Sequence, residues 1–225
     1  MKHILYVISV FLVLTVLASC TDKSAMRQRL DYVSQCNRAD TVFTEAWLPM
    51  VDSLVNYFDR HGNANEKMMA HYLKGRVHHD LGESPIALEC YQKATEMADT
   101  THGDCDLYTL YAIYGQMALL FDRQYLPDDE MKALKASEQI AWKDGDIQSA
   151  IKAYELRIRP YFLRGDTDSM IIVMKDARDM FLKSGSRDKA ARAIYSLISI
   201  SLDRGNTQEA RHYLDIYERE SGKFN

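Results

Sequence analysis

The 225-residue sequence has few of the residues that interrupt helices, with only 4 prolines and 10 glycines. Long helices therefore suit it better than many short strands. Its 4 cysteines are too few and too scattered for a small protein held by a disulfide framework. It has no basic excess either, since 28 lysines and arginines stand against 32 aspartates and glutamates. We therefore expect a helical protein that does not bind nucleic acid.

Sequence signatures of catalysis are missing too. The sequence contains no G-x-S-x-G, H-E-x-x-H or C-x-x-C motif and no phosphate-binding glycine loop. The best metal-like group is His71, His78, His79 and Asp80. On one helix, however, His71 lies about 10.5 Å of rise from His78, too far for one small ion. We expect these histidines to fill core positions, and we expect neither an enzyme nor a bound cofactor or metal.

The first nineteen residues have the character of a signal peptide. A positively charged start precedes an apolar run of 14 residues, from Ile4 to Leu17. As a helix this run spans about 21 Å, short of the ~30 Å hydrocarbon core of a bilayer. The run ends in the tetrapeptide LASC, residues 17–20, which resembles the bacterial lipobox.

The lipobox resemblance implies that residues 1–19 are a lipoprotein signal peptide and that Cys20 carries a lipid anchor. Residues 20–225 would then be the mature domain, held in the bacterial cell envelope and, we expect, at the outer membrane, on its periplasmic or surface face. An ordinary secretory signal with a chance cysteine is the alternative. Of the other cysteines, Cys90 suits a small buried position, and a bridge between any two of Cys36, Cys90 and Cys105 stays open.

Glycines recur about every 20 residues. They are Gly62, Gly82, Gly103, Gly145, Gly165, Gly185 and Gly205, and the doubled interval holds a turn-like segment at residues 122–124. Between them apolar residues fall at helical spacing, as at Ile194, Leu197 and Ile198. A glycine just after a helix supplies the left-handed residue that ends it, and a following Asp, Asn or Ser can cap the next helix. The pattern predicts helices of roughly 14 to 17 residues joined by short turns.

Neighbouring helices are expected to pair as hairpins, with the first hairpin turning at residues 39–41. A single pair cannot bury its apolar face alone, so the pairs stack into a solenoid, and the fold class is all-α. The five predicted pairs cover residues 24–60, 64–100, 105–143, 147–183 and 187–221. The helix over 207–221 has a polar outer face, as a terminal repeat requires. We therefore expect the chain to end naturally there and residues 24–225 to fold alone as a monomer.

The pattern resembles the tetratricopeptide repeat (TPR) family. Residues 76–99 read RVHHDLGESPIALECYQKATEMAD and match the end of the family's helix A, the turn, and helix B. Gly82 matches the turn, and Gly75 and Gly115 match the point where helices A and B pack closest. The resemblance covers about Met68 to Tyr217, with a repeat of about 41 residues against about 34 in the family. It implies a TPR-like right-handed superhelix.

In this family the first helix of each pair lines a concave groove that binds a partner. The positions that the resemblance assigns to the groove are Tyr72, Arg76, His79, Gln116, Lys152, Glu155, Arg159, Phe162, Arg192 and Tyr195. Arginine and aromatic residues are typical of binding hot spots. The alternative is a solvated helix face with arginines that extend their stems along it.

The resemblances together imply a lipid-anchored, non-enzymatic scaffold that binds a protein or peptide partner in its groove. A second reading is an extracytoplasmic sensor array of a signalling or transcription-regulator system, as a truncated relative of longer regulators. A third is glycan binding in a surface uptake system, for which the sequence holds no specific motif.

Overall fold

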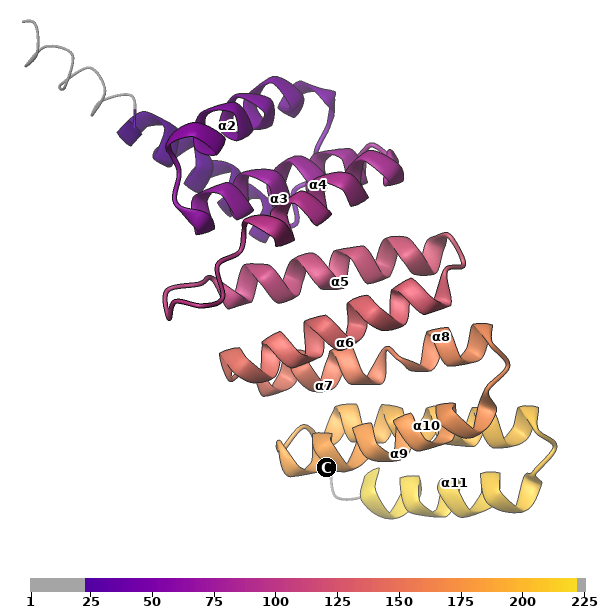
Figure 1. Cartoon of the computed structure of the whole chain (residues 1–225). Helices are drawn as coiled ribbons and strands as arrows, with labels where there is room; N and C mark the ends of the chain where they lie inside the picture. The colour runs from indigo at the N-terminus through magenta and orange to yellow at the C-terminus, as the bar shows by residue number, and fades with distance from the viewer. Residues whose placement is uncertain (1–22, 222–225) are drawn as a thin grey trace, which may run out of the picture. The chain divides into compact units, whose positions relative to one another are not determined.

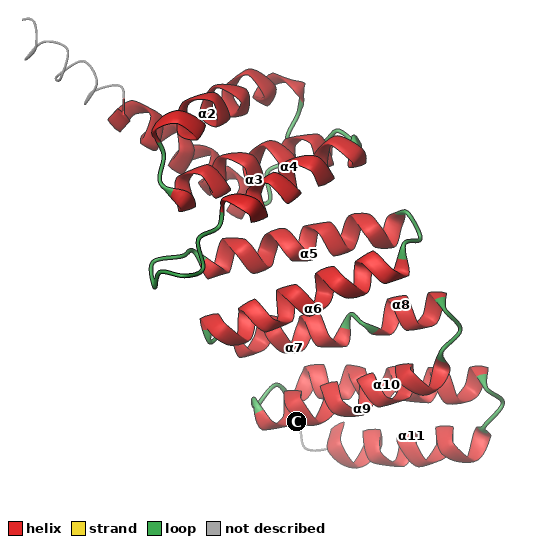
Figure 2. Cartoon of the chain, in the orientation of Figure 1, coloured by secondary structure: helices red, strands yellow, loops and turns green. Residues whose placement is uncertain are grey.

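The computed structural model of the chain describes residues 23–221, so the predicted signal peptide and Cys20 lie outside the described residues. Figure 2 shows helices joined by short loops, and the described range contains no strand. No helix of this range is long and apolar enough to cross a bilayer. The prediction of an all-α fold is confirmed.

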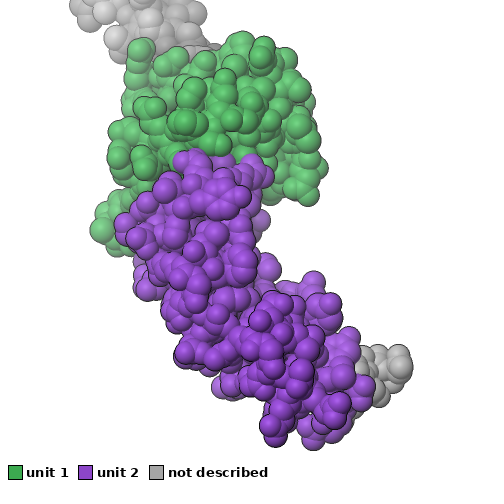
Figure 3. All heavy atoms as spheres, turned by 90° about the vertical axis from the view of Figure 1, so that its right-hand side faces the viewer, with its two compact units in different colours: residues 1–105 green, residues 106–225 purple. Residues whose placement is uncertain are grey.

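The chain divides into two compact units, Met1–Cys105 and Asp106–Asn225, coloured separately in Figure 3. The first unit holds a helix described over residues 23–38, a 3-10 turn η1 (Glu45–Trp47), α2 (Leu48–His61), α3 (Ala64–Asp80) and α4 (Ser84–Met97). The second holds α5 (Leu107–Arg123), α6 (Pro127–Asp144), α7 (Ile147–Glu155), α8 (Ile158–Leu163), α9 (Thr167–Lys183), α10 (Arg187–Asp203) and α11 (Thr207–Ser221). Within each unit consecutive helices pack against one another (Figure 1), and the hairpins predicted at residues 64–100, 105–143, 147–183 and 187–221 are present.

A left-handed residue ends seven of these helices. In each turn the residue after it donates its N–H to the carbonyl five positions earlier, at 2.8–3.1 Å, and so satisfies a terminal carbonyl of the helix. The left-handed residues are Asp40, Gly82, Tyr125, Gly145, Gly165, Gly185 and Gly205. Five of the recurring glycines therefore act as predicted. Gly62 and Gly103 do not, since Gly62 is extended at φ −84° and neither has a positive φ.

Aspartates cap the starts of three helices in the second unit. Asp106, Asp146 and Asp166 each accept the backbone N–H of the residue three positions on, at 3.0–3.1 Å. Each also accepts the hydroxyl of that same residue at 2.7 Å. In the first unit, Asn63 and Glu66 form a reciprocal capping box at α3. The predicted capping by the residue directly after a glycine is confirmed at Asn63, Asp146 and Asp166, but Ser186 makes no such bond.

The helix expected from residue 147 to 163 is broken in two, between Glu155 and Ile158. Pro160 is the cause, because it has no N–H to donate to the carbonyl of Leu156 and its ring would collide with that carbonyl in a regular helix. Arg159 donates its N–H to the Leu156 carbonyl in its place, at 3.1 Å. Within this segment Tyr154, Ile158, Tyr161 and Phe162 fall at helical spacing, which predicts a single helix and conceals the break.

Candidate functional site

In the first unit the predicted groove residues lie inside packed structure. Tyr72 and His79 are only 7% and 8% exposed. Tyr72 lies with its ring 6.0 Å from that of Tyr91, and His79 Nδ1 lies 3.3 Å from Tyr91 Oη. Arg76 is half-buried and donates from Nε to Asn37 Oδ1 at 2.9 Å. Contacts within the unit thus account for all three, and the two buried side chains offer little surface to a partner.

The histidines of α3 each have their own neighbour. His71 Nε2 lies 2.9 Å from Asp59 Oδ1, and His78 Nδ1 lies 2.6 Å from Glu83 Oε2. All three histidines are buried, so the expectation that they fill core positions is confirmed. Among residues 23–221 no group of acidic, histidine or cysteine side chains is placed to hold a metal.

The three described cysteines are free thiols. Cys90 is buried, as expected, and burial raises the pKa of its thiol to about 11. The thiol therefore stays protonated and unreactive at neutral pH.

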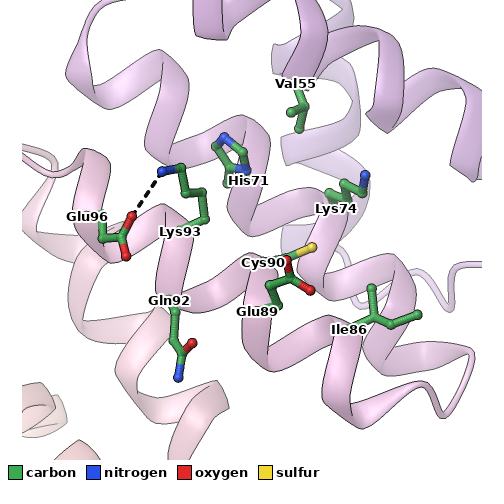
Figure 4. A pocket seen from close by; sticks show the side chains of 9 residues that line it. All are labelled: Val55, His71, Lys74, Ile86, Glu89, Cys90, Gln92, Lys93 and Glu96. Atoms are coloured by element: carbon green, nitrogen blue, oxygen red, sulfur yellow. Dashed lines mark hydrogen bonds and ion pairs between the residues drawn. The ribbon is translucent and has the colours of Figure 1, made fainter.

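A hollow of about 410 Å³ lies over α2, α3 and α4 in the first unit (Figure 4). Its charges balance, because two lysines, Lys74 and Lys93, are matched by Glu89 and Glu96. Lys93 donates to Glu96 at 3.0 Å, the pair drawn in the figure. None of the predicted groove residues lines this hollow, and its mixed charge indicates no particular ligand.

The short helix α8 presents an arginine and a phenylalanine together. Arg159 Nε donates to Asp122 Oδ1 at 2.6 Å, and the guanidinium carbon lies 5.4 Å from the centre of the Phe162 ring. The Phe162 residue is 57% exposed. A cation over an exposed aromatic ring forms a preorganised polar-apolar surface of the type found at binding hot spots.

Glu130, on the first turn of α6, is a buried carboxyl group near this pair. It is only 4% exposed, and its Oε2 has no hydrogen-bond partner. Burial, aided by the charge of Asp122 and opposed by that of Arg159, raises its pKa to about 7. This group could not be predicted from the sequence, because the first turn of α6 holds three consecutive acids and only packing shows which one is buried.

Of the remaining predicted residues of the second unit, Lys152, Arg192 and Tyr195 lie on exposed helix surface, whereas the side chain of Glu155 is only 19% exposed. Lys152 pairs with Glu155 at 3.0 Å. Arg192 lies 3.6 Å from Asp188 and keeps 70% of its side chain exposed. Tyr195 is 68% exposed. The three exposed side chains are accessible to a partner, as the groove prediction requires, and their role in binding stays a prediction.

A second pocket, which we call the α5–α7 pocket, lies within the second unit and encloses about 380 Å³. Two predicted groove residues, Gln116 and Lys152, line it together. The other lining residues are Tyr111, Ala112, Gly115, Leu134, Ser137, Gln148, Ser149, Ala153, Leu156 and Lys189. The residues Glu155, Arg159, Phe162, Arg192 and Tyr195 are not part of its lining.

Gln148, Leu156 and Lys189 are pocket residues that the sequence reading missed. Gln148 and Leu156 lie one helical turn before and after Lys152, so helical spacing alone could have added them. Lys189 comes from α10, and its Nζ donates to Gln148 Oε1 at 2.7 Å. Gln148 Oε1 also accepts from Ser186 Oγ at 3.0 Å, so this amide fixes the ammonium at the rim of the pocket.

Gly115 differs from Gly75, although the family pattern gives both the same place. At Gly75 the two helices of the hairpin pack closest, and a Cβ there would collide with the Tyr91 ring. A Cβ at Gly115 would meet nothing within 4 Å. The prediction of close helix approach is therefore confirmed at Gly75 and wrong at Gly115, which faces the α5–α7 pocket instead.

No protein-family model matches the sequence, and no match is found among curated proteins. Several solved structures resemble the fold. A kinesin light chain-like protein of Podosopora anserina with nearly identical TPR-like repeats is 13% identical, covers 90% of this chain and 97% of its own, and has a TM-score of 0.66. The fold is TPR-like.

Two other structures support this TPR-like fold. BtubC from P. vanneervenii is 12% identical, with 90% of each chain covered and a TM-score of 0.59. Aspartyl phosphate phosphatase F from Bacillus subtilis is 13% identical and matches 82% of this chain but 48% of its own, with a TM-score of 0.63. At this level of identity the likeness establishes the helical-repeat scaffold and leaves the ligand to be argued from this chain's own residues.

Proposed function

We propose that this chain is a lipid-anchored TPR-like scaffold of the bacterial cell envelope that binds a protein or peptide partner through its second unit and catalyses no reaction. The observation that carries the binding proposal is the α5–α7 pocket, which Gln116 and Lys152 line together with apolar side chains. A rigid, preformed surface of this kind binds with little ordering cost.

The exposed side chains of the neighbouring helices support the proposal. Phe162 and Tyr195 are 57% and 68% exposed, far more than core aromatics. Arg159 is held over Phe162 by Asp122, so its guanidinium is already placed for a partner. The Arg159–Asp122 pair is itself half-exposed and contributes little to stability.

A photo-crosslinking amino acid placed in the full chain, in intact cells, tests the proposal. Leu156 lines the pocket and is 41% exposed. Leu182 on α9 is 36% exposed and lies outside the pocket lining, so it serves as the matched control. We expect a specific adduct from position 156 and none from position 182. Equal adducts from both positions would contradict the proposal.

Substitutions on α8 give a second readout. Arg159→Ala and Phe162→Ala should weaken the adduct at position 156 while the melting temperature stays nearly unchanged, because Phe162 is exposed and Arg159 belongs to a half-exposed ion pair. A large drop in melting temperature would mean that these side chains serve the core and not a partner.

A further inference from the structure

We propose that the α5–α7 pocket is specific for an internal peptide segment in which an apolar side chain stands next to an acidic residue. This proposal rests on the proposed function, since it names the chemistry of the partner at the same site. Three features of the pocket carry it: the apolar walls, the open position of Gly115, and the unbalanced charge of the rim.

The walls are apolar. Ala112 on α5, Leu134 on α6, Ala153 on α7, and Leu156 directly after α7 line a space of about 380 Å³. Burying one leucine-sized side chain in a pocket of this kind favours binding. Leu156 is 41% exposed, so its surface is available for such a contact.

Gly115 keeps the pocket open at a cost to α5. A glycine inside a helix is less favourable than alanine. Elsewhere in the chain such a cost has a packing reason, as at Gly75. At Gly115 no neighbouring atom would meet an added Cβ, so packing does not require the glycine. The space that its missing side chain leaves belongs to the pocket, and a bound side chain would use it.

The rim of the pocket carries two lysines, and one of them has no carboxylate partner among the described residues. Two lysines, Lys152 and Lys189, line the pocket, and no aspartate or glutamate does. Lys152 has Glu155 as a partner outside the lining. Lys189 makes no ion pair with any carboxylate of the described residues, and Gln148 holds its ammonium in place. This charge is complementary to an acidic side chain.

The pocket is better suited to an acidic side chain than to a chain terminus. A terminal carboxylate needs several free donors in a fork, but the hydroxyls of the pocket are already engaged. Ser137 Oγ donates to the carbonyl of Tyr111 at 3.0 Å, and Ser149 Oγ donates to Asp146 Oδ2 at 2.7 Å. The rim lysines remain as the groups that an acidic residue of a passing segment can reach.

Four fluorescent seven-residue peptides with blocked ends test both requirements. The central residue is leucine or serine, its two neighbours are both aspartate or both lysine, and the other positions are glycine and serine. We expect the leucine–aspartate peptide to bind the full chain at least about tenfold more tightly than the other three. Its binding should weaken as salt is raised. If the leucine–aspartate peptide has no such advantage, the proposal is overturned.

Two variants locate the binding in the pocket. Gly115→Ala adds a methyl group to the wall without a clash, so it should weaken leucine–aspartate binding severalfold while the protein stays folded. Lys189→Gln should also weaken it and flatten its salt dependence. Lys135→Gln, on exposed α6 surface outside the lining, is the matched control. Unchanged binding by Gly115→Ala would show that the apolar side chain sits elsewhere and would overturn the proposal.

The two proposals can fail separately. A specific adduct at position 156 together with equal binding of all four peptides would refute the peptide chemistry and leave the partner site in place. Equal adducts at positions 156 and 182 would refute the partner site itself.

Discussion

Gly75 faces Tyr91 so closely that a Cβ on the glycine would lie 2.5 Å from two carbons of the ring. The Tyr91 ring is fully buried between α3 and α4, so it has no room to retreat. The same family pattern places Gly115 in α5, where an added Cβ would meet nothing within 4 Å. The family pattern gives these two glycines the same role, but packing requires a glycine only at Gly75.

We expect Gly75→Ala and Gly115→Ala to shift stability in opposite directions. The first forces two atoms together in a packed core and should destabilise the protein by about 1–3 kcal/mol. The second replaces an unstrained helical glycine and should stabilise it by up to about 1 kcal/mol. Thermal melts followed by far-UV circular dichroism measure both. Shifts of the same sign would contradict the assignment of these two positions.

The helix cap at Asp146 should stabilise the folded protein more than the equivalent cap at Asp166. Both carboxylates accept two bonds from the serine three residues on, but Asp146 also accepts Tyr111 Oη at 2.7 Å. We expect Asp166→Ala to cost about 1–2 kcal/mol and Asp146→Ala about 1 kcal/mol more. Urea unfolding measures the difference. In Tyr111→Phe the extra cost should vanish, and its persistence would assign it to another cause.

The Asp146 cap also makes the stability of the protein depend on pH. Hydrogen bonds from Ser149 lower the pKa of Asp146 in the folded protein. The stabilisation is therefore present above the ordinary pKa of an aspartate and is lost as the pH falls through the lowered value. The destabilisation caused by Asp146→Ala should shrink in acid, and a cost independent of pH would contradict this account.

Glu130 should make the protein less stable as the pH rises from about 4.5 to about 7. Its pKa is raised from 4.5 to about 7 in the folded protein, so in this range the unfolded chain loses the proton while the folded chain keeps it. Stability then falls with pH, by about 3 kcal/mol over the range. Glu130→Gln should remove this loss, as urea unfolding at a series of pH values would show.

Asp129→Asn provides the control for Glu130. It removes a carboxylate from the same turn of α6, but that side chain is 45% exposed and pairs with Lys132. The pH profile of this variant should follow that of the wild type. If Glu130→Gln and Asp129→Asn had equal effects, the burial of Glu130 would not be the cause.

The periodic turns could be predicted from the sequence because glycine is the residue that adopts a positive φ without strain. At the turn predicted from residues 122–124, the left-handed residue itself could not be predicted, because the φ of +56° falls on Tyr125, a residue type that gives no such signal. The break before Pro160 did have a signal, the proline itself, but the regular apolar spacing of that segment concealed it.

The candidate site could be predicted only in part, because burial and contacts between helices depend on packing. Helix α3 is buried around most of its circumference, so a pattern that assigns one face to a groove cannot tell which of its residues stay accessible. Tyr72 and His79 therefore lie in the interior. In the second unit, Lys189 and Gln148 are 41 residues apart and lie on different helices, and packing brings them together. Residue spacing along one helix cannot predict such a contact.

The lipid anchor is tested by one substitution with a matched control. Cys20→Ala removes the thiol that the lipobox-like segment LASC would present for acylation, whereas Cys36→Ala removes a free thiol of the described domain. Several hydrocarbon chains hold a protein stably at a membrane, and their loss releases it. We expect Cys20→Ala to move the protein from the detergent phase to the aqueous phase in a phase-partition assay, with residues 1–19 uncleaved or cleaved elsewhere. Cys36→Ala should partition like the wild type, and unchanged partition of Cys20→Ala would refute the anchor.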